Sequence, residues 1–111
     1  MDFTVEPRKR FFPENPADIS TLSAELSDDM RKVRVTVELD RDDTHPDLDL
    51  LLSDHSGKEI CHSTIIETIG STIKFTLHIR IEDVRFPLSL KCQLSYLDDT
   101  VHTEMEILIP L

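Results

Sequence analysis

The stretch Ile73-Lys74-Phe75-Thr76-Leu77-His78-Ile79-Arg80-Ile81 decides the fold class of this chain. Apolar and polar residues alternate through it without interruption. Successive side chains of a β-strand point to opposite faces, so the alternation predicts a strand with one buried and one solvated face. Such strands are typical of antiparallel sheets, because parallel sheets are usually covered on both faces.

The same period of two recurs elsewhere in the chain. It runs through residues 33–39, 88–96 and 101–109. A shorter alternation over 47–53 ends at the turn-forming tetrad 54–57, which predicts a hairpin. The pattern wavers only between residues 60 and 69.

Two neighbouring isoleucines, Ile65 and Ile66, interrupt the alternation there. Both are apolar and both are expected to be buried, although adjacent strand residues point to opposite faces. We therefore expect a β-bulge or a strand that changes sheet at this point.

The N-terminal third is less regular. Prolines punctuate a segment of about residues 7–19, and Phe3 to Val5 alternate as a short first strand would. Residues 19–30 fit either an amphipathic helix or a strand that turns at Asp28-Asp29. Ser and Thr occupy four of the eight positions 20–27, which favours the strand.

The count is seven to eight strands in 111 residues, which suits a single domain over residues 1–111. We predict an all-β fold, an antiparallel β-sandwich of immunoglobulin-like or fibronectin-III-like type. A small antiparallel barrel is the alternative.

The composition excludes several functions. The chain has 22 acidic and 12 basic residues, a net charge of −10, and two glycines. Nucleic-acid binding needs clustered Lys and Arg, and phosphate loops need glycine, so neither is expected. No apolar stretch is long enough to cross a membrane, and the N-terminus has no apolar signal segment, so a soluble, cytoplasmic protein is predicted.

The two cysteines, Cys61 and Cys92, lack the spacing of a metal site. Alternation places Cys92 on the inward face of its strand, whereas Cys61 lies in the ambiguous segment. A disulfide between two strands is the alternative, but in a cytoplasmic protein both are expected to be reduced thiols.

An aspartate-rich stretch over residues 40–54 is the first candidate site. Four of its carboxylates form a possible calcium site, because Ca²⁺ prefers several oxygens gathered on loops. They are Asp40, Asp42, Asp43 and Asp47. A calcium- or carbohydrate-binding module is therefore the alternative function, and a solvated, turn-forming loop is the interpretation that the pattern favours.

Histidines give a weaker candidate. His78 and His102 lie at outward positions of two strands and would face each other if those strands shared a sheet. With Glu104 or Glu106 they would make a zinc or nickel site, although ordinary polar sheet surface is the favoured interpretation.

Catalysis is not expected. The chain lacks a Gly-x-Ser-x-Gly elbow, and the neighbours Cys61 and His62 would point to opposite faces of a strand. The small sandwich also offers little room for a cleft. We predict that the protein is not an enzyme and has no cofactor beyond the calcium considered above.

The only basic cluster consists of Arg8, Lys9 and Arg10. Two aromatic residues, Phe11 and Phe12, follow it directly. Together these residues are a candidate partner contact, although packing of the two Phe over one end of the sandwich is the favoured interpretation. The preferred function is a non-catalytic domain that mediates protein–protein interaction, with a partner whose basic surface suits the net charge. Its partners are not expected to include nucleic acid or membrane. An accessory domain of a hydrolase is a third hypothesis.

Overall fold

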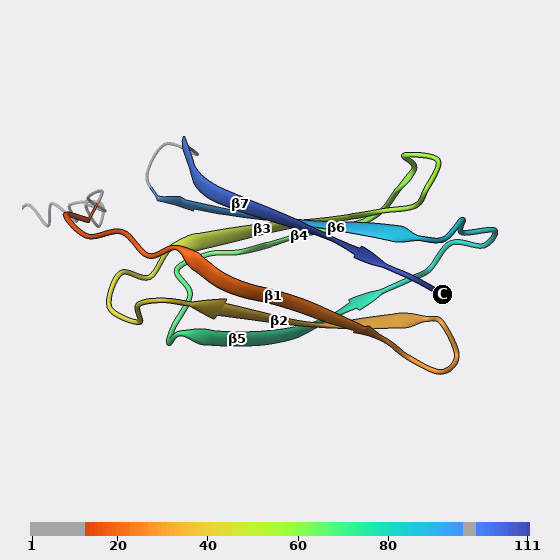
Figure 1. The fold of residues 1–111 in the computed structure, drawn as a ribbon, viewed down its shortest axis with the longest axis horizontal. Coiled ribbons are helices and arrows are strands. Elements are labelled where there is room, and N and C mark those ends of the chain that lie inside the picture. The colour runs from red at the N-terminus through yellow and green to blue at the C-terminus, as the bar shows by residue number, and fades with distance from the viewer. Residues whose placement is uncertain (1–12, 97–99) are drawn as a thin grey trace, which may run out of the picture.

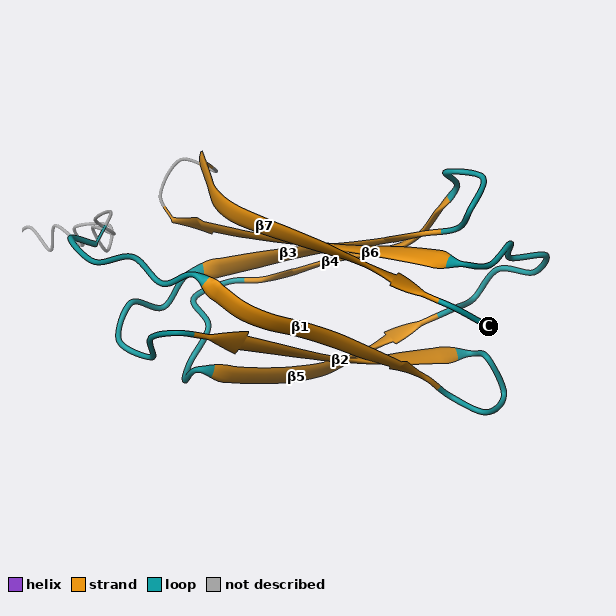
Figure 2. Cartoon of the chain, in the orientation of Figure 1, coloured by secondary structure: helices purple, strands orange, loops and turns teal. Residues whose placement is uncertain are grey.

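The computed structural model describes residues 13–96 and 100–111, and this part of the chain forms seven strands in two antiparallel sheets without a helix (Figures 1 and 2). In chain order the strands are β1 (Ile19–Leu26), β2 (Lys32–Leu39), β3 (Asp47–Ser53), β4 (Glu59–Ile65), β5 (Thr72–His78), β6 (Leu88–Tyr96) and β7 (Thr100–Ile109). The three-stranded sheet has the order β1-β2-β5, and the four-stranded sheet has the order β4-β3-β6-β7. The predicted β-sandwich is confirmed. The barrel alternative is wrong, because the hydrogen-bonded ladders form two separate sheets.

The strand order gives partial information on the type of sandwich. The constant-type immunoglobulin fold places its fourth strand in the same sheet as its first, second and fifth strands. Here the fourth strand, β4, pairs instead with β3 in the opposite sheet. The immunoglobulin-like type is therefore not confirmed, and the fibronectin-III-like type stays a prediction.

The core lies between the two sheets and comes from the inward positions of the alternating runs. The central strands β2, β3 and β6 supply most of its fully buried side chains: Val33, Val35, Val37, Leu48, Leu50, Leu52, Leu88, Leu90, Cys92 and Leu94. Each of these residues was expected to face inward. The period-two pattern therefore predicts the core of the central strands.

Residues 19–26 form a strand, so the helix alternative for this segment is wrong. β1 pairs along its length with β2, from Leu22 opposite Val37 to Leu26 opposite Val33. The turn between them is closed by a hydrogen bond from the Ser27 hydroxyl to the Asp29 carboxylate, at 2.6 Å. This carboxylate also accepts the amide of Arg31. The predicted turn at Asp28-Asp29 is confirmed.

The start of β7 departs from the predicted alternation. Leu94 is opposite Thr103, but the next residue of β6, Ser95, is opposite Val101, so His102 is an extra residue in the ladder. This bulge reverses the face of the sheet to which the β7 residues before His102 point. Val101 was expected to face inward, and that prediction is wrong, because 45% of its surface is exposed.

The pair Ile65 and Ile66 also behaves differently from the expectation. Ile65 ends β4 and is partly buried, whereas Ile66 lies in the crossover to β5 and is 68% exposed. The irregularity of β4 occurs earlier, where the ladder slips between Cys61 and Glu59. The prediction that both isoleucines are buried is therefore wrong, because the chain leaves the sheet between them.

The two long sides of the sandwich differ. β1 and β7 lie along each other and close one side (Figure 1). β4 and β5 approach each other much less, and the inward residues Ile73 and Phe75 of β5 are only partly buried. The side between β4 and β5 is therefore the less covered edge of the core.

Candidate functional site

Three segments meet at one end of the sandwich, residues 13–18, 40–46 and 66–71. The amide of Asp40 donates to the carbonyl of Asp18, and the amide of Thr68 donates to the carbonyl of Pro46. These segments carry one arginine, Arg41, and six acids: Glu14, Asp18, Asp40, Asp42, Asp43 and Glu67. We call this surface the acidic end.

The opposite end of the sandwich has a different charge balance. Its loops are residues 27–31, 54–58 and 79–87. They carry five acids and four bases, namely Asp28, Asp29, Asp54, Glu82, Asp83, Arg31, Lys58, Arg80 and Arg85. The negative charge of these loops is therefore concentrated at the acidic end.

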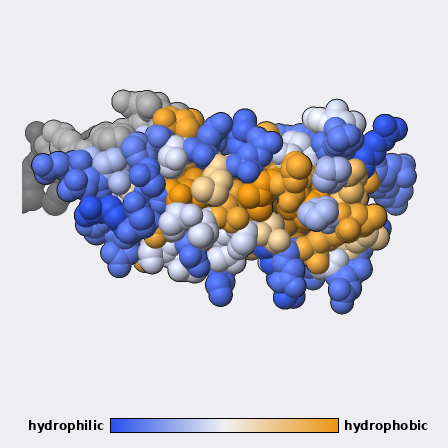
Figure 3. All heavy atoms as spheres, in the orientation of Figure 1, coloured by the Kyte–Doolittle hydropathy of each residue, from blue (hydrophilic) through white to orange (hydrophobic). Residues whose placement is uncertain are grey.

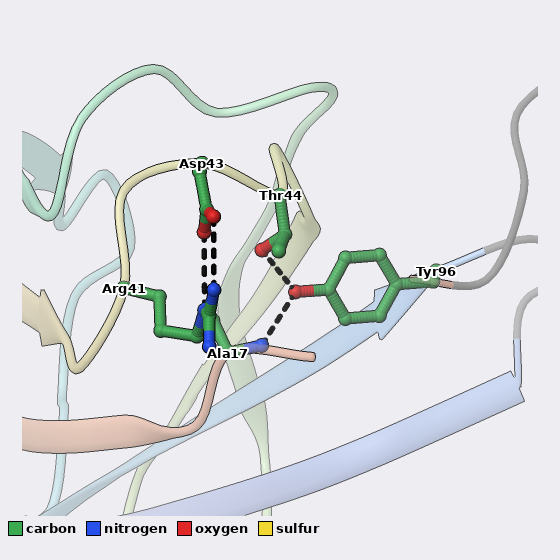
Figure 4. A network of polar contacts seen from close by, with 5 residues as sticks. All are labelled: Ala17, Arg41, Asp43, Thr44 and Tyr96. Carbon is green, nitrogen blue, oxygen red and sulfur yellow. Dashed lines mark hydrogen bonds and ion pairs between the residues drawn. The ribbon is translucent and has the colours of Figure 1, made fainter. Parts of the chain in front are cut away.

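Three of the four aspartates of the calcium hypothesis accept hydrogen bonds from separate donors. Asp43 accepts the Arg41 guanidinium through both oxygens, at 3.1 and 2.9 Å (Figure 4). This contact lowers the pKa of Asp43 and raises the pKa of Arg41. Asp40 accepts the amide of Asp18 at 2.7 Å.

The remaining two aspartates are Asp42 and Asp47. Asp47 is the first residue of β3, and its carboxylate accepts the amide of Glu67 at 2.9 Å. Asp42 is exposed on the loop. Within residues 13–96 and 100–111 no three His, Cys, Asp or Glu side chains are grouped to hold a metal ion. The structure does not bring the four carboxylates together, so the solvated, turn-forming loop stays the favoured interpretation, and a calcium titration tests the alternative.

Tyr96, at the end of β6, connects the segments of the acidic end (Figure 4). Its hydroxyl accepts the amide of Ala17 at 2.9 Å and hydrogen bonds with the Thr44 hydroxyl. Tyr96 and Ala17 are both buried. The single tyrosine therefore ties the segment before β1 and the loop between β2 and β3 to the four-stranded sheet. Sequence reasoning missed this role, although a lone inward tyrosine at a strand end was the available signal.

His102 joins the two sheets at the same end. Its ring packs edge-on against Tyr96, with 6.1 Å between ring centroids, and its Nε2 lies 3.1 Å from Oδ1 of Asp18. Asp18 directly precedes β1 and His102 belongs to β7, so this contact links the two sheets along the closed side of the sandwich. The β7 bulge brings the ring there.

The condition for a site made of His78 and His102, that their strands share a sheet, is not met. β5, which contains His78, belongs to the three-stranded sheet, whereas β7 belongs to the four-stranded sheet. His78 is exposed on the outer face of its sheet. The two histidines therefore do not share a surface, and no zinc or nickel site follows from them.

The outer face of the four-stranded sheet continues the polar surface of the acidic end. Asp49 accepts hydrogen bonds from Thr64 and from the His62 ring, each at 2.7 Å. The Gln93 amide donates to Glu104 at 2.9 Å. A shallow hollow of about 240 Å³ lies here, lined by Asp47, Asp49, Thr64, Gln93, Ser95 and Val101.

Exposed apolar side chains accompany the acids. Ile66 is 68% exposed and Ile69 is 84% exposed, and both lie beside Glu67 in the crossover from β4 to β5. On the face shown in Figure 3, hydrophilic side chains dominate the acidic end and apolar surface follows the line where β1 and β7 meet. An apolar anchor within a charged rim is the usual composition of a protein-binding patch.

The two cysteines both face the core but cannot bond to each other in this fold. Cys61 lies on β4 and Cys92 on β6, with β3 between them. Two strand spacings separate their Cα atoms by at least about 9.5 Å, beyond the roughly 7 Å that a disulfide can bridge. Cys61 faces inward and His62 is exposed, so they form no dyad.

The basic cluster Arg8, Lys9, Arg10, Phe11 and Phe12 lies outside the described residues, as does the strand predicted from Phe3 to Val5. In the part that is described, no helix is long and apolar enough to cross a membrane.

Comparisons with known proteins support the fold. No family model matches the chain, and no curated protein matches it. A solved β-glucuronidase from Parabacteroides merdae, with glycerol in its active site, is similar with a TM-score of 0.58 and 15% sequence identity. The alignment covers 84% of this chain and 13% of the enzyme chain. At this identity the likeness carries the sandwich fold and not the activity.

Proposed function

We propose that this β-sandwich is a non-catalytic module that mediates protein–protein interaction, and that the acidic end binds a basic surface of its partner. The observation that carries the proposal is the uneven charge of the two ends, six acids and one arginine against five acids and four bases. Opposite potentials steer partners together and select among them. A partner with clustered Lys and Arg would therefore be guided to the acidic end.

The packing of the acidic end supports this role. Tyr96 and His102 hold its segments against the sheets, so little conformational entropy is lost when a partner binds. Ile66 and Ile69 supply apolar area beside Glu67. Apolar contacts of this kind contribute most of the affinity of an interface, while the surrounding charges set its orientation.

The test starts with proteins captured by the full chain from source cells at low ionic strength. Each candidate is purified, and its affinity for the chain is measured by calorimetry. The test variant carries Asp42→Lys and Ile69→Ser at the acidic end. The matched control carries Glu82→Lys and Met30→Ser at the opposite end, where Met30 is 46% exposed.

The proposal predicts a partner whose affinity falls about tenfold or more for the test variant, is unchanged for the control, and weakens as salt is added. A partner weakened only by the control variant would contradict it. So would the recovery of no partner whose affinity depends on salt.

A cytoplasmic location and an accessory role beside a hydrolase remain predictions. The β-glucuronidase named above contains a similar fold within a longer chain. This precedent supports the idea that such a sandwich can be part of a larger enzyme.

A further inference from the structure

The edge of β5 is an unused hydrogen-bonding surface. β5 pairs with β2 on one side, and no strand in the described part of the chain pairs with it on the other. Its sequence, Thr72 to His78, contains neither proline nor glycine. An edge of this kind offers a row of amide and carbonyl groups to another strand.

Hydrogen bonds at both ends of β5 show which residues direct their main-chain N–H and C=O groups to the free edge. The carbonyl of Ser71 accepts the amide of Leu39, and the amide of Ile79 donates to the carbonyl of Arg31, each at 2.7 Å. Residues that bond to an antiparallel neighbour alternate along a strand. The odd-numbered residues 71–79 therefore bond to β2, and the main-chain groups of residues 72, 74, 76 and 78 point to the free edge.

The inner side of this edge is incompletely covered. Ile73 and Phe75 are only partly buried, whereas Val35 and Val37, opposite them on β2, are 1% and 0% exposed. The adjacent edge strand of the other sheet, β4, does not close the gap. A further strand beside β5 would complete the burial of these two side chains.

We propose that the occupant is the β5 strand of a second copy of this chain, paired antiparallel about a two-fold axis at Phe75. The two three-stranded sheets would then form one six-stranded sheet. Phe75 would lie opposite Phe75 of the second copy, and Ile73 opposite Leu77. Aromatic and apolar cross-strand pairs of this kind stabilise a ladder.

Lys74 selects this register. Main-chain groups that point to the free edge must lie opposite each other, so the two-fold axis passes through a residue. Only an axis at residue 74, 75 or 76 pairs more than three residues of each strand. An axis at residue 74 sets Lys74 against Lys74, and an axis at 76 sets Lys74 against His78. Only the axis at Phe75 uses the whole strand and sets Lys74 opposite Thr76, which avoids like charges.

A seven-residue strand pair buries less area than a standard stable interface. The dimer should therefore be weak, and it should form at protein concentrations of about 0.1–1 mM. The dimer uses the edge of β5 and the proposed partner complex uses the acidic end, whose segment 66–71 directly precedes β5.

Sedimentation equilibrium of the full chain tests the dimer. Thr76→Lys places a lysine opposite the Lys74 of the other copy, which makes one like-charge pair on each side of the axis, and should raise the dimer dissociation constant about tenfold. Lys74→Glu combined with Thr76→Lys sets opposite charges against each other and should restore dimerisation. Ser23→Lys is the matched control, because it adds the same charge to an exposed position of β1.

Wild-type protein that stays monomeric at about 1 mM would overturn the proposal. So would a dimer that Ser23→Lys weakens as much as Thr76→Lys does, or one that the combined variant fails to restore. A heterologous strand on β5 would show as a complex that leaves the wild-type chain monomeric on its own.

Discussion

Asp54 shows what one buried carboxylate does in this fold. It is 4% exposed and follows β3 at the hairpin to β4. Its Oδ1 accepts the hydroxyl and amide of Ser56 and the amide of Lys58, and its Oδ2 accepts the amide of Arg85. These hydrogen bonds, the Ser56 hydroxyl first, lower the pKa of Asp54 from 3.8 to about 2. The charged carboxylate thus joins the hairpin to the loop before β6.

Asp54→Asn should lower the thermal midpoint at neutral pH by several degrees. A carboxyl whose pKa is depressed on folding adds stability above its unfolded pKa and loses it as pH falls through the folded value. The difference in thermal midpoint between wild type and variant should therefore narrow as the pH falls from 4 to 2. Calorimetric melts across this range measure it, with Asp42→Asn as the exposed control. An unchanged gap would mean that Asp54 gives no charge-dependent stability.

The two thiols should differ in reactivity. Cys92 is fully buried, and burial raises the pKa of its thiol to about 12. Because the thiolate is the reactive form, Cys92 should not react with a disulfide reagent at pH 8, while the half-buried Cys61 should. A thiol titration should count one group in the folded protein and two after denaturation. Equal rates for both thiols in the folded protein would contradict this.

At the scale of elements, Tyr96 is expected to hold β1 and the loop between β2 and β3 in place. Tyr96→Phe removes the hydroxyl and leaves the buried amide of Ala17 without that partner. The free energy of unfolding should fall by about 1–2 kcal/mol, measured by urea denaturation. Thr64→Val is the control, because its hydrogen bond to Asp49 is exposed. Equal effects of the two substitutions would contradict the role given to Tyr96.

The same loop should not respond to calcium. Asp40, Asp43 and Asp47 accept hydrogen bonds from three different donors. Millimolar calcium should therefore leave the thermal midpoint unchanged, because only binding to the folded state raises it. A rise with calcium but not with magnesium would show that the loop rearranges into a site.

The elements that were predicted well are those whose pattern alone encodes burial. In β2, β3 and β6 every second residue is apolar and faces the core. The predictions that were wrong concern residues whose position depends on how neighbouring strands pair. A bulge opposite Leu94 turns Val101 outward, and a crossover exposes Ile66. Alternation also says nothing of sheet order, so the sequence left open whether His78 and His102 face each other.

The candidate site was predicted only in part. The run of acids at residues 40–47 was visible in the sequence, but its grouping as a calcium site was not supported by the contacts. Asp18 and Glu67 are distant in the sequence and join this surface only through folding. The acidic end is therefore a property of the strand order, which brings three loops to one end.

At the scale of the whole molecule, the charge that makes up the net −10 is distributed unevenly between the two ends of the sandwich. One end of the sandwich is acidic and carries exposed isoleucines, and the other end is nearly balanced. A charged end of this kind favours one orientation of approach for a basic partner. The edge of β5 offers a second surface, for self-association.

The most direct test of the proposed function is a map of amide chemical shifts recorded as the purified basic partner is added to the full chain. We expect the changes to concentrate in residues 13–18, 40–46 and 66–71 and to fade as salt is raised. Changes concentrated in residues 27–31 and 79–87 and insensitive to salt would contradict it.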